Sequence, residues 1–345
     1  MPRHELLSTP ITHIDPRALH ATALIEGMAG TAFQARNLAR AAEIFAMMIR
    51  EPKGGVILTL AGSLISAGQK KVVATLVREH MVDCIVSTGA NMVDQDFFEG
   101  LGYQHYIAHP RLDDNELREA RIDRIYDTLI DEDELRVCDM TIADIASALP
   151  PRPYSSREFL SVMGAYLKAR GKDHSSILEA CYDEGVPVFV PAFSDCSAGF
   201  GLVHHQWHNK DRHATIDSAQ DFLELTQLTI AAGETGLLMI GGGVPKNFTQ
   251  DVVVAADILG QEVSMHKYAV QITVADERDG ALSGSTLREA SSWGKVETTF
   301  EQMVYAEATL VFPLLAAYAL EQNAAQGRTA RRYADAFAAI EQPKW

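Results

Sequence analysis

Short apolar runs recur along the chain, and each one ends in a loop of small or polar residues before a helical pattern begins. A clear example is the run 56–60, which is followed by Ala61-Gly62-Ser63. Five such runs can be recognised, over 56–60, 84–86, 186–190, 237–240 and 268–274. Nearly continuous apolar strands that alternate with helices are typical of a parallel sheet with both faces covered. The pattern therefore predicts an α/β fold with a parallel sheet and helices on both faces.

The rest of the chain has mainly helical patterns. Two N-terminal helices, over 16–28 and 35–49, are predicted ahead of the first strand. The charged segment 110–180 is predicted to be a helical insertion, with a proline-rich break at 149–153. Because no repeat, low-complexity tract or flexible linker interrupts these patterns, we expect residues 1–345 to form a single domain.

Composition narrows the class of protein. The chain has 345 residues, 47% of them hydrophobic and 22% charged, which is typical of a soluble globular protein. The formal net charge of −16 disfavours nucleic acid and anionic membranes as partners and favours cationic small molecules. The longest apolar stretch, 308–320, contains Pro313 and is too short to span a membrane, so it predicts a buried helix. The N-terminus has no secretory signal pattern, and we expect a cytoplasmic protein.

The cysteines and histidines do not form a recognisable metal pattern. The cysteines are widely spaced, at Cys84, Cys138, Cys181 and Cys196. Neither a zinc site nor a disulfide framework is indicated, and Cys196 is predicted to be a buried thiol. The histidines at 204–208, with His213, lack metalloenzyme spacing and predict a polar surface loop. We therefore expect no metal.

Glycine-rich loops follow the predicted strands and should converge, because ligands bind at the carboxyl ends of parallel strands. Gly241-Gly242-Gly243 would let backbone approach a dinucleotide, and the amides of Gly62-Ser63 and Gly89-Ala90 could hold its phosphates. None of these loops has the Gly-x-Gly-x-x-Gly pattern. Each one alone favours an ordinary turn from strand to helix over a cofactor site.

Acidic residues occupy the same loops, and two interpretations of them remain open. They are Asp94, Asp96, Asp195, Asp276, Glu277, Asp279 and Glu289. Such carboxylates could bind ribose hydroxyls or a substrate amine, or they could simply cap helix N-termini.

The segment Ser291-Ser292-Trp293-Gly294-Lys295-Val296 places a lysine beside an indole in an otherwise uncharged run. Lysine forms Schiff bases with carbonyl and imine carbons, provided that its site disfavours the charged form. A solvated strand or turn residue is the simpler interpretation of this hexapeptide by itself. With Glu289 six residues earlier, the segment could instead surround a cationic substrate with a carboxylate, an aromatic face and an amine.

Seven motifs together resemble the deoxyhypusine synthase family. They are Ala61 to Gly68, Met81-Val82-Asp83, Ser87 to Asn91, Pro191 to Asp195, Gly241 to Lys246, Ser292 to Val296 and Ala308 to Pro313. The resemblance spans roughly residues 35–325 in one order, and the Ser-Trp-Gly-Lys element is the most specific part of it. It implies a Rossmann-like parallel sheet, in agreement with the strand pattern.

The resemblance also implies an activity. Members of the family use NAD to convert a polyamine such as spermidine into an imine, pass the aminobutyl group to a lysine, and then transfer it to a second amine. Lys295 matches the imine-forming lysine, and Glu289 and Trp293 match residues that line the amine pocket. We also expect Asp94, Asn247 and Asp279 to bind substrate.

Cofactor and assembly follow from the same resemblance. The positions that match NAD contacts are Gly62, Ser63, Ser66, Thr88, Gly89, Ala90, Asp195, Gly242, Glu307 and Ala308. The family is tetrameric, with its NAD and amine sites at subunit interfaces, so the resemblance implies a homotetramer.

This chain departs from the protein-modifying enzymes chiefly in the amine pocket. Phe200 and Leu282 replace aspartates, Asn247 replaces a histidine, and Glu307 replaces an aspartate at the cofactor. Fewer carboxylates should weaken binding of a long polyamine, since each charged hydrogen bond contributes about 1.5–3 kcal/mol. The pattern resembles the deoxyhypusine-synthase-like branch, in which a diamine can be the acceptor and homospermidine the product. The acceptor, a free diamine or a protein lysine, stays open.

Two other functions are compatible with the sequence. One is an NAD-dependent enzyme of another class on the same fold, such as a deacylase, which the lack of a cysteine quartet disfavours. The other is a non-catalytic protein that binds NAD or a polyamine, which the presence of Glu289, Trp293 and Lys295 disfavours.

Overall fold

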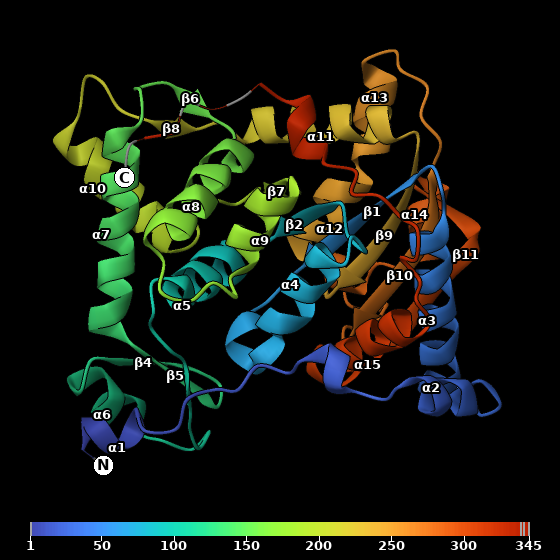
Figure 1. The fold of residues 1–345 in the computed structure, drawn as a ribbon, viewed down its shortest axis with the longest axis horizontal. Helices are drawn as coiled ribbons and strands as arrows, with labels where there is room; N and C mark the ends of the chain where they lie inside the picture. Colours follow the sequence, from blue (N-terminus) through green and yellow to red (C-terminus); the bar gives the residue numbers. More distant parts are fainter. Residues whose placement is uncertain (1, 339, 341, 344–345) are drawn as a thin grey trace.

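A six-stranded parallel sheet forms the centre of the protein (Figure 1). The computed structural model describes residues 2–338, 340 and 342–343. The sheet has the order β11-β10-β9-β1-β2-β7. Its strands are β1 (Gly54–Leu60), β2 (Cys84–Ser87), β7 (Val188–Phe189), β9 (Glu234–Ile240), β10 (His266–Thr273) and β11 (Val296–Tyr305).

This strand order is that of the doubly wound Rossmann fold. From β1 the chain moves outward to β2 and β7, and it then returns to the other side of β1 to form β9, β10 and β11. β1 and β9 pair in register from Gly54 opposite Glu234 to Leu60 opposite Ile240. The reversal of direction at this pair leaves a crevice at the carboxyl ends of the two strands, where such folds bind ligands.

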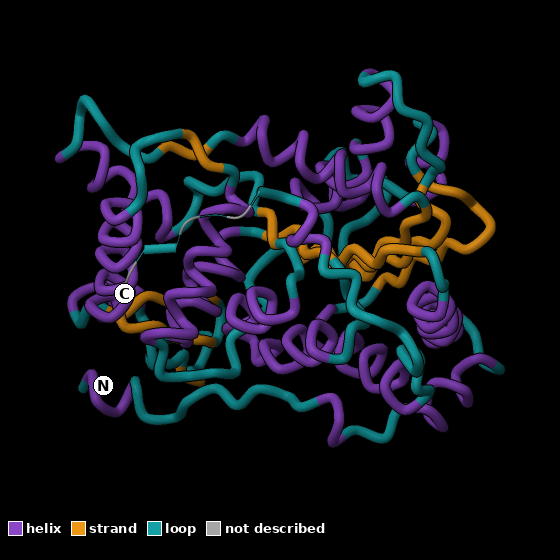
Figure 2. Tube along the Cα trace, turned by 45° about the horizontal axis from the view of Figure 1, so that its top comes forward, coloured by secondary structure: helices purple, strands orange, loops and turns teal. Residues whose placement is uncertain are grey.

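Helices cover both faces of the sheet, as Figure 2 shows. The helices are α1 (Arg3–Leu6), α2 (Thr22–Ala29), α3 (Phe33–Arg50), α4 (Lys70–Arg78), α5 (Phe98–Gly100), α6 (Asp114–Glu119), α7 (Glu132–Ala148), α8 (Ser156–Arg170), α9 (Ile177–Glu184), α10 (Ser197–His208), α11 (Ser218–Ala232), α12 (Gly243–Gln250), α13 (Val252–Ile258), α14 (Leu287–Ser292) and α15 (Ala308–Glu321). Shorter helical segments are η1 (Pro16–Ala18), η2 (Ile65–Gln69), η3 (Ala90–Phe97), η4 (Leu282–Gly284) and η5 (Tyr333–Ala336).

The alternation of side chains along β1 explains why both faces need a cover. Leu58 belongs to one buried cluster with residues of α3, α4 and α15, whereas the adjacent Ile57 belongs to a second cluster with residues of α11 and α13. Successive strand residues point to opposite faces, so a strand that is apolar throughout must be covered twice. The predicted two-sided α/β sheet is therefore confirmed.

Two small sheets lie outside the central one. β3 (Tyr106–Ile107), β5 (Thr128–Asp131) and β4 (Ile122–Ile125) form an antiparallel sheet, and β6 (Pro153–Tyr154) pairs with β8 (Thr215–Ile216). The segment 110–180, predicted as a helical insertion, therefore contains strands as well as α6, α7, α8 and α9. These strands are only two to four residues long, so they lack the long apolar runs that signal a strand.

The predicted strands and N-terminal helices are present in the structure, with one strand more than expected in the central sheet. All five predicted strands are present, but the sheet also has β11, which sequence reasoning did not identify as a strand. The two N-terminal helices are present as α2 and α3, with only a short turn, η1, where the first was expected to begin. The apolar stretch 308–320 forms the buried helix α15, which accommodates Pro313. Among the described residues, no helix is long and apolar enough to cross a membrane.

Candidate active site

Lys295 lies directly after a helix whose ending is specified by the sequence. Gly294, at φ +70°, lies just beyond α14, and its amide donates to the carbonyl of Ser291 at 2.9 Å. The amide of Lys295 donates to the carbonyl of Ala290 at 3.1 Å. These two bonds form a Schellman motif, which favours glycine because its first residue outside the helix is left-handed. The Trp-Gly-Lys sequence thereby ends α14 and starts β11 with Lys295 at a fixed position.

The side chain of Lys295 is largely buried and ion-paired. It is 12% exposed, and its Nζ lies 2.5 Å from Oδ1 of Asp251. The same Nζ lies 5.2 Å from the ring centroid of Trp293, within the range of a cation–π interaction. The indole itself is 67% exposed. The lysine is therefore enclosed mainly by elements other than its own loop.

A cavity of 240 Å³ opens beside Lys295. It is lined by Asn247, Gln250, Leu282, Ser285, Glu289, Ala290, Trp293 and Lys295. Four residues that the sequence predicted for catalysis or amine binding, Lys295, Glu289, Trp293 and Asn247, thus lie around one cavity. Its volume is slightly below that of pockets for drug-sized molecules, about 300–1,000 Å³, so it suits a small ligand.

Two charged residues of this site were missed in the sequence. One is Asp251, described above, and the other is Lys246 on α12, which is 1% exposed. Nζ of Lys246 donates to Oγ of Ser285 at 2.9 Å and to the carbonyl oxygens of Ser285 and Leu282. Burial lowers the pKa of Lys246 to about 8, an effect that Glu289 opposes and the charge of Lys295 reinforces. The spacing of Asp251 from Asn247, one helical turn, was the available signal for its proximity.

Two of the predicted substrate-binding carboxylates, Asp94 and Asp279, do not line the cavity. Asp94 accepts a hydrogen bond from the amide of Ser197 at 2.7 Å, and burial raises its pKa to about 6. Asp279 is exposed and accepts from the amide of Ala281 at 3.2 Å. Their roles in substrate binding stay predictions. The capping alternative does apply to Asp96, which accepts from the amides of Ile177 and Leu178 at the start of α9.

The loops predicted to hold NAD meet at the carboxyl ends of β1, β2 and β9. The amide of Ala61 donates to the carbonyl of Ile240 at 2.9 Å, and Oγ1 of Thr88 donates to the carbonyl of Gly62 at 3.0 Å. Gly62 has φ +67°, and a Cβ there would meet no atom within 4 Å. Its backbone therefore faces open space at the switch point of the sheet, which is the kind of surface that a dinucleotide phosphate requires.

The glycine loop after β9 also contacts the wall of the lysine cavity. A Cβ on Gly242 would lie 2.4 Å from Cα of Ser283, so only glycine permits this approach. Nε2 of Gln271 bridges the carbonyls of Gly241 and Ser283, at 3.0 and 3.3 Å. The segment 282–285 therefore contacts the glycine loop through Ser283 and lines the cavity through Leu282 and Ser285.

The other positions that match NAD contacts make hydrogen bonds or packing contacts within the chain. Glu307 caps α15 by accepting from the amide of Leu310, immediately beside Ala308. Ser66 donates its amide to Gln95 at 2.8 Å, Asp195 lies in an exposed turn, and Gly89 packs against Cys196. Ser63 lies in the loop after β1, and Ala90 is the first residue of η3, shortly after β2. Contact of these residues with NAD stays a prediction.

The histidine cluster has a structural explanation. Residues 204–208 belong to α10 and not, as predicted, to a loop. His205 is buried, where its Nδ1 lies 2.9 Å from Oγ of Ser147 and its Nε2 accepts from the amide of Ala214. Cys196 is a buried thiol, as predicted, and burial raises its pKa to about 12. Among the described residues, no group of histidines, cysteines and carboxylates is arranged to hold a metal ion.

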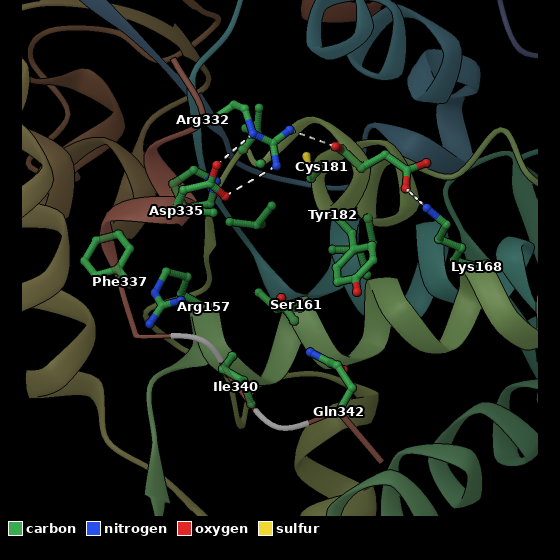
Figure 3. A pocket seen from close by; sticks show the side chains of 18 of the residues that line it. Arg157, Ser161, Lys168, Cys181, Tyr182, Arg332, Asp335, Phe337, Ile340 and Gln342 are labelled. Atoms are coloured by element: carbon green, nitrogen blue, oxygen red, sulfur yellow. Dashed lines mark hydrogen bonds and ion pairs between the residues drawn. The ribbon is translucent and has the colours of Figure 1, made fainter. Parts of the chain in front are cut away.

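A second cavity, of 590 Å³, lies away from these loops (Figure 3). It is lined by α8, α9, the amino end of β7 and the C-terminal segment, where Arg332 bonds Asp335 at 2.7 Å and the carbonyl of Asp183 at 3.1 Å. Ligands of doubly wound folds bind at the opposite, carboxyl ends of the strands. We therefore place the candidate active site at Lys295.

The fold and the site define a Rossmann-type α/β protein with a buried lysine beside a glycine-lined crevice. The sequence profile of deoxyhypusine synthase matches residues 23–319. The chain belongs to the deoxyhypusine synthase family, a family of aminobutyl-transfer enzymes.

Individual relatives agree with this assignment over nearly their whole length. A deoxyhypusine synthase-like protein of Chlorobaculum tepidum is 62% identical over 96% of this chain and 95% of its own. A protein of the same name from Coxiella burnetii is 55% identical over 97% and 96%. A probable deoxyhypusine synthase 2 from Methanosarcina mazei is 40% identical over 94% and 93%.

A solved structure supports the fold. The crystal structure of a protein from Entamoeba histolytica that is described as a deoxyhypusine synthase aligns with this chain at a TM-score of 0.59 and 19% identity. The alignment covers 90% of this chain and 97% of the Entamoeba histolytica chain. At this identity the likeness concerns the fold alone.

Proposed function

We propose that this protein is an NAD-dependent aminoalkyl transferase that takes an aminobutyl group from a polyamine through an imine on Lys295. The observation that carries the proposal is the position of Lys295, enclosed beside Glu289 and Asp251 and next to the glycine-lined crevice. The acceptor is a diamine, with homospermidine as the product, or a protein lysine, with deoxyhypusine as the product.

Charge in and around the cavity favours an amine substrate. Glu289 lines the cavity and Asp251 lies at the amine of Lys295, so two carboxylates are available to cationic groups. The exposed indole of Trp293 offers a face to a further ammonium group. The net charge of −16 favours the approach of cations from solution.

The residues of the crevice fit NAD. Bound NAD would supply the hydride acceptor for oxidising the donor amine. The open backbone at Gly62 would contact its phosphates, and the close approach of Gly242 to the segment 282–285 would keep that site next to the cavity. These contacts support a cofactor position near Lys295, with Ser63, Thr88 and Asp195 as further contacts.

We further propose a homotetramer in which the sites lie at subunit interfaces. One face of α10 exposes Phe200, Val203 and Trp207, whose side chains are 67%, 69% and 70% exposed. Their spacing of three and four residues places them in one apolar stripe. Contiguous exposed apolar surface of this kind is typical of an interface between proteins.

The pocket favours a small donor or acceptor. Leu282 contributes an apolar wall where the protein-modifying enzymes carry an aspartate, and Asn247 contributes an amide. Phe200 lies on the exposed face of α10 and not in the cavity of its own chain. The family's usual polyamine contacts are thus reduced, which supports the deoxyhypusine-synthase-like branch.

Identification of the amine products tests this function. The purified protein would be incubated with NAD and, separately, with spermidine, putrescine and mixtures of both, and the amines would be identified by mass. We expect loss of spermidine and formation of homospermidine when putrescine is supplied. Free nicotinamide as a product would instead identify an NAD-consuming enzyme of another class, and NAD binding without amine turnover would identify a binding protein.

A further inference from the structure

Asp251 contacts the reactive nitrogen of the site from a different part of the chain. It is the residue between α12 and α13, and its Oδ1 lies 2.5 Å from Nζ of Lys295. Its other oxygen, Oδ2, accepts a hydrogen bond from Nδ2 of Asn247 at 2.8 Å. The carboxylate is therefore held at both oxygens, by the amine on one side and by the amide on the other.

The environment of this pair is suited to proton transfer. Asp251 is 32% exposed and Lys295 is 12% exposed, so the carboxylate lies on the more open side of the contact. The other charged groups near Lys295 are Lys246 on α12 and Glu289 on α14. Within the described part of the chain, Asp251 is the carboxylate that forms an ion pair with Lys295.

We propose that Asp251 accepts the proton of Lys295 during imine transfer and that Asn247 positions its carboxylate. This inference rests on the proposed transferase function and adds a residue to it. An ammonium has no free electron pair, so Lys295 must lose a proton before it can attack an imine carbon. Among the described residues, the base in direct contact with that nitrogen is Asp251.

Asp251 can accept and return every proton that moves in the transfer step. Lys295 gives a proton to Asp251 and then attacks the carbon of the protonated donor imine, whose π electrons move to the donor nitrogen. A proton passes from the lysine nitrogen of this adduct to the donor nitrogen, through the Asp251 carboxyl group. The carbon–nitrogen bond to the donor breaks, the Lys295 imine forms, and the departing amine takes the proton that Asp251 had stored. Asp251 is then a carboxylate again.

The role of Asn247 explains one departure from the family. A histidine at this position would carry its own ionisable group into the pocket, whereas the amide of Asn247 donates to Asp251 without titrating. We expect the amide to restrict the carboxylate to the orientation that faces Lys295. Asn247 is thus a positioning residue, and Asp251 is a catalytic residue because it contacts the reacting nitrogen.

Asp251→Asn separates this role from a structural one, because it keeps the size of the side chain and removes its charge and basicity. The first measurement is kcat and KM for aminobutyl transfer with NAD and spermidine. We expect kcat to fall by about 100-fold, the lower end of the effect of a general base, with a much smaller change in KM. Asn247→Ala should lower kcat by several-fold.

The second measurement does not depend on the enzyme activity. The protein is treated with formaldehyde and cyanoborohydride over a series of pH values, and methylation of Lys295 is followed by peptide mass spectrometry. Loss of the ion pair frees the nitrogen of Lys295, so Lys295 should be methylated faster in Asp251→Asn than in the wild-type protein at the same pH. A more reactive amine together with slower transfer is a combination that mere structural damage would not give.

Asp257→Asn is the matched control, because it makes the same change on the exposed end of α13. It should leave both measurements unchanged. Wild-type kcat in an active Asp251→Asn protein, or slower methylation of its Lys295, would overturn the assignment of Asp251 alone. If the wild-type protein transfers no aminobutyl group, the proposed function itself is wrong, and the role of Asp251 in transfer is lost with it.

Discussion

Two buried lysines of this protein, Lys70 and Lys295, differ in how their charges are balanced. Lys70 is enclosed by two carboxylates, Glu99 at 2.7 Å and Asp173, and Glu99 is in turn bonded by His13 and His105, each at 2.8 Å. Burial alone would lower the pKa of Lys70, but these carboxylates outweigh burial and the pKa is raised. Both lysines border a cavity, but Lys295 has a single ion-paired carboxylate, Asp251, where Lys70 has two. Burial of a lysine beside a cavity therefore does not by itself indicate chemistry, and the two sites differ in how many carboxylates hold the charge.

The largest expected effect is the loss of aminobutyl transfer when Lys295 is replaced. Lys295→Ala should reduce aminobutyl transfer by at least about a thousand-fold, because the nucleophile is lost. Lys295→Arg is the matched variant, since it retains a cation for Asp251 but cannot form the imine. Transfer rates measured by mass of the products should be equally low for both variants. Substantial activity in Lys295→Arg would mean that the position needs only a positive charge.

The second effect concerns stability and should be confined to Lys70. Lys70→Met leaves Glu99 and Asp173 without their cation, and breaking a buried ion pair by removing one partner typically costs about 3–5 kcal/mol. Urea unfolding should show this decrease in the free energy of unfolding. Lys168→Met, which removes an exposed pair with Asp183, should change it little. Equal losses in both variants would contradict the structural role of the Lys70 network.

A third buried lysine, Lys246, should make the free energy of unfolding depend on pH. Its pKa is lowered from 10.5 to about 8 in the folded protein, so the unfolded chain binds more protons between these values. The contribution of Lys246 to stability should therefore rise with pH from about 8 to 10.5, by roughly 3 kcal/mol. The free energy of unfolding of the wild type, relative to Lys246→Met, should increase by that amount. A difference that stays constant with pH would show that Lys246 keeps its charge on folding.

The smallest effect concerns Trp293. Trp293→Leu removes the aromatic face near Nζ of Lys295, and an exposed cation–π interaction contributes about 0.5–1 kcal/mol. We expect KM for the amine to rise about two- to five-fold in this variant, and less in Trp293→Phe, which keeps a ring. Steady-state kinetics with a varied polyamine measures the difference. Identical KM values for Phe and Leu would show that the ring face does not bind the substrate.

The sequence predicted the central fold well because its strands are apolar on both faces. That property made β1, β2, β7, β9 and β10 readable as runs. The sixth strand, β11, lies at the sheet edge, and its residues 297–302 are all exposed or partly exposed, so it carries no such run. Short pairings such as that of β3 with β5 depend on contacts between residues far apart in the sequence. The periodicity of apolar residues along the chain does not reveal them.

The local part of the candidate site could be predicted from neighbouring residues, whereas Asn247, on α12, was predicted through the family resemblance. Glu289, Trp293 and Lys295 belong to one helix ending, which a glycine in the left-handed region specifies from nearby residues. Lys246 on α12 and Asp251, the residue after it, precede Lys295 by more than 40 residues, and they lie near it because α12 and α14 follow the neighbouring strands β9 and β10. A single sequence does not show which side chains of two such elements meet.

Trapping of the intermediate tests the central claim most directly. The protein would be incubated with NAD and spermidine, reduced with borohydride, digested and examined by peptide mass spectrometry, with an incubation lacking NAD as the control. We expect one aminobutyl adduct, dependent on NAD and located on Lys295. An adduct on Lys246, or equal labelling of the Lys295→Ala protein, would contradict the assignment of Lys295 as the imine-forming residue.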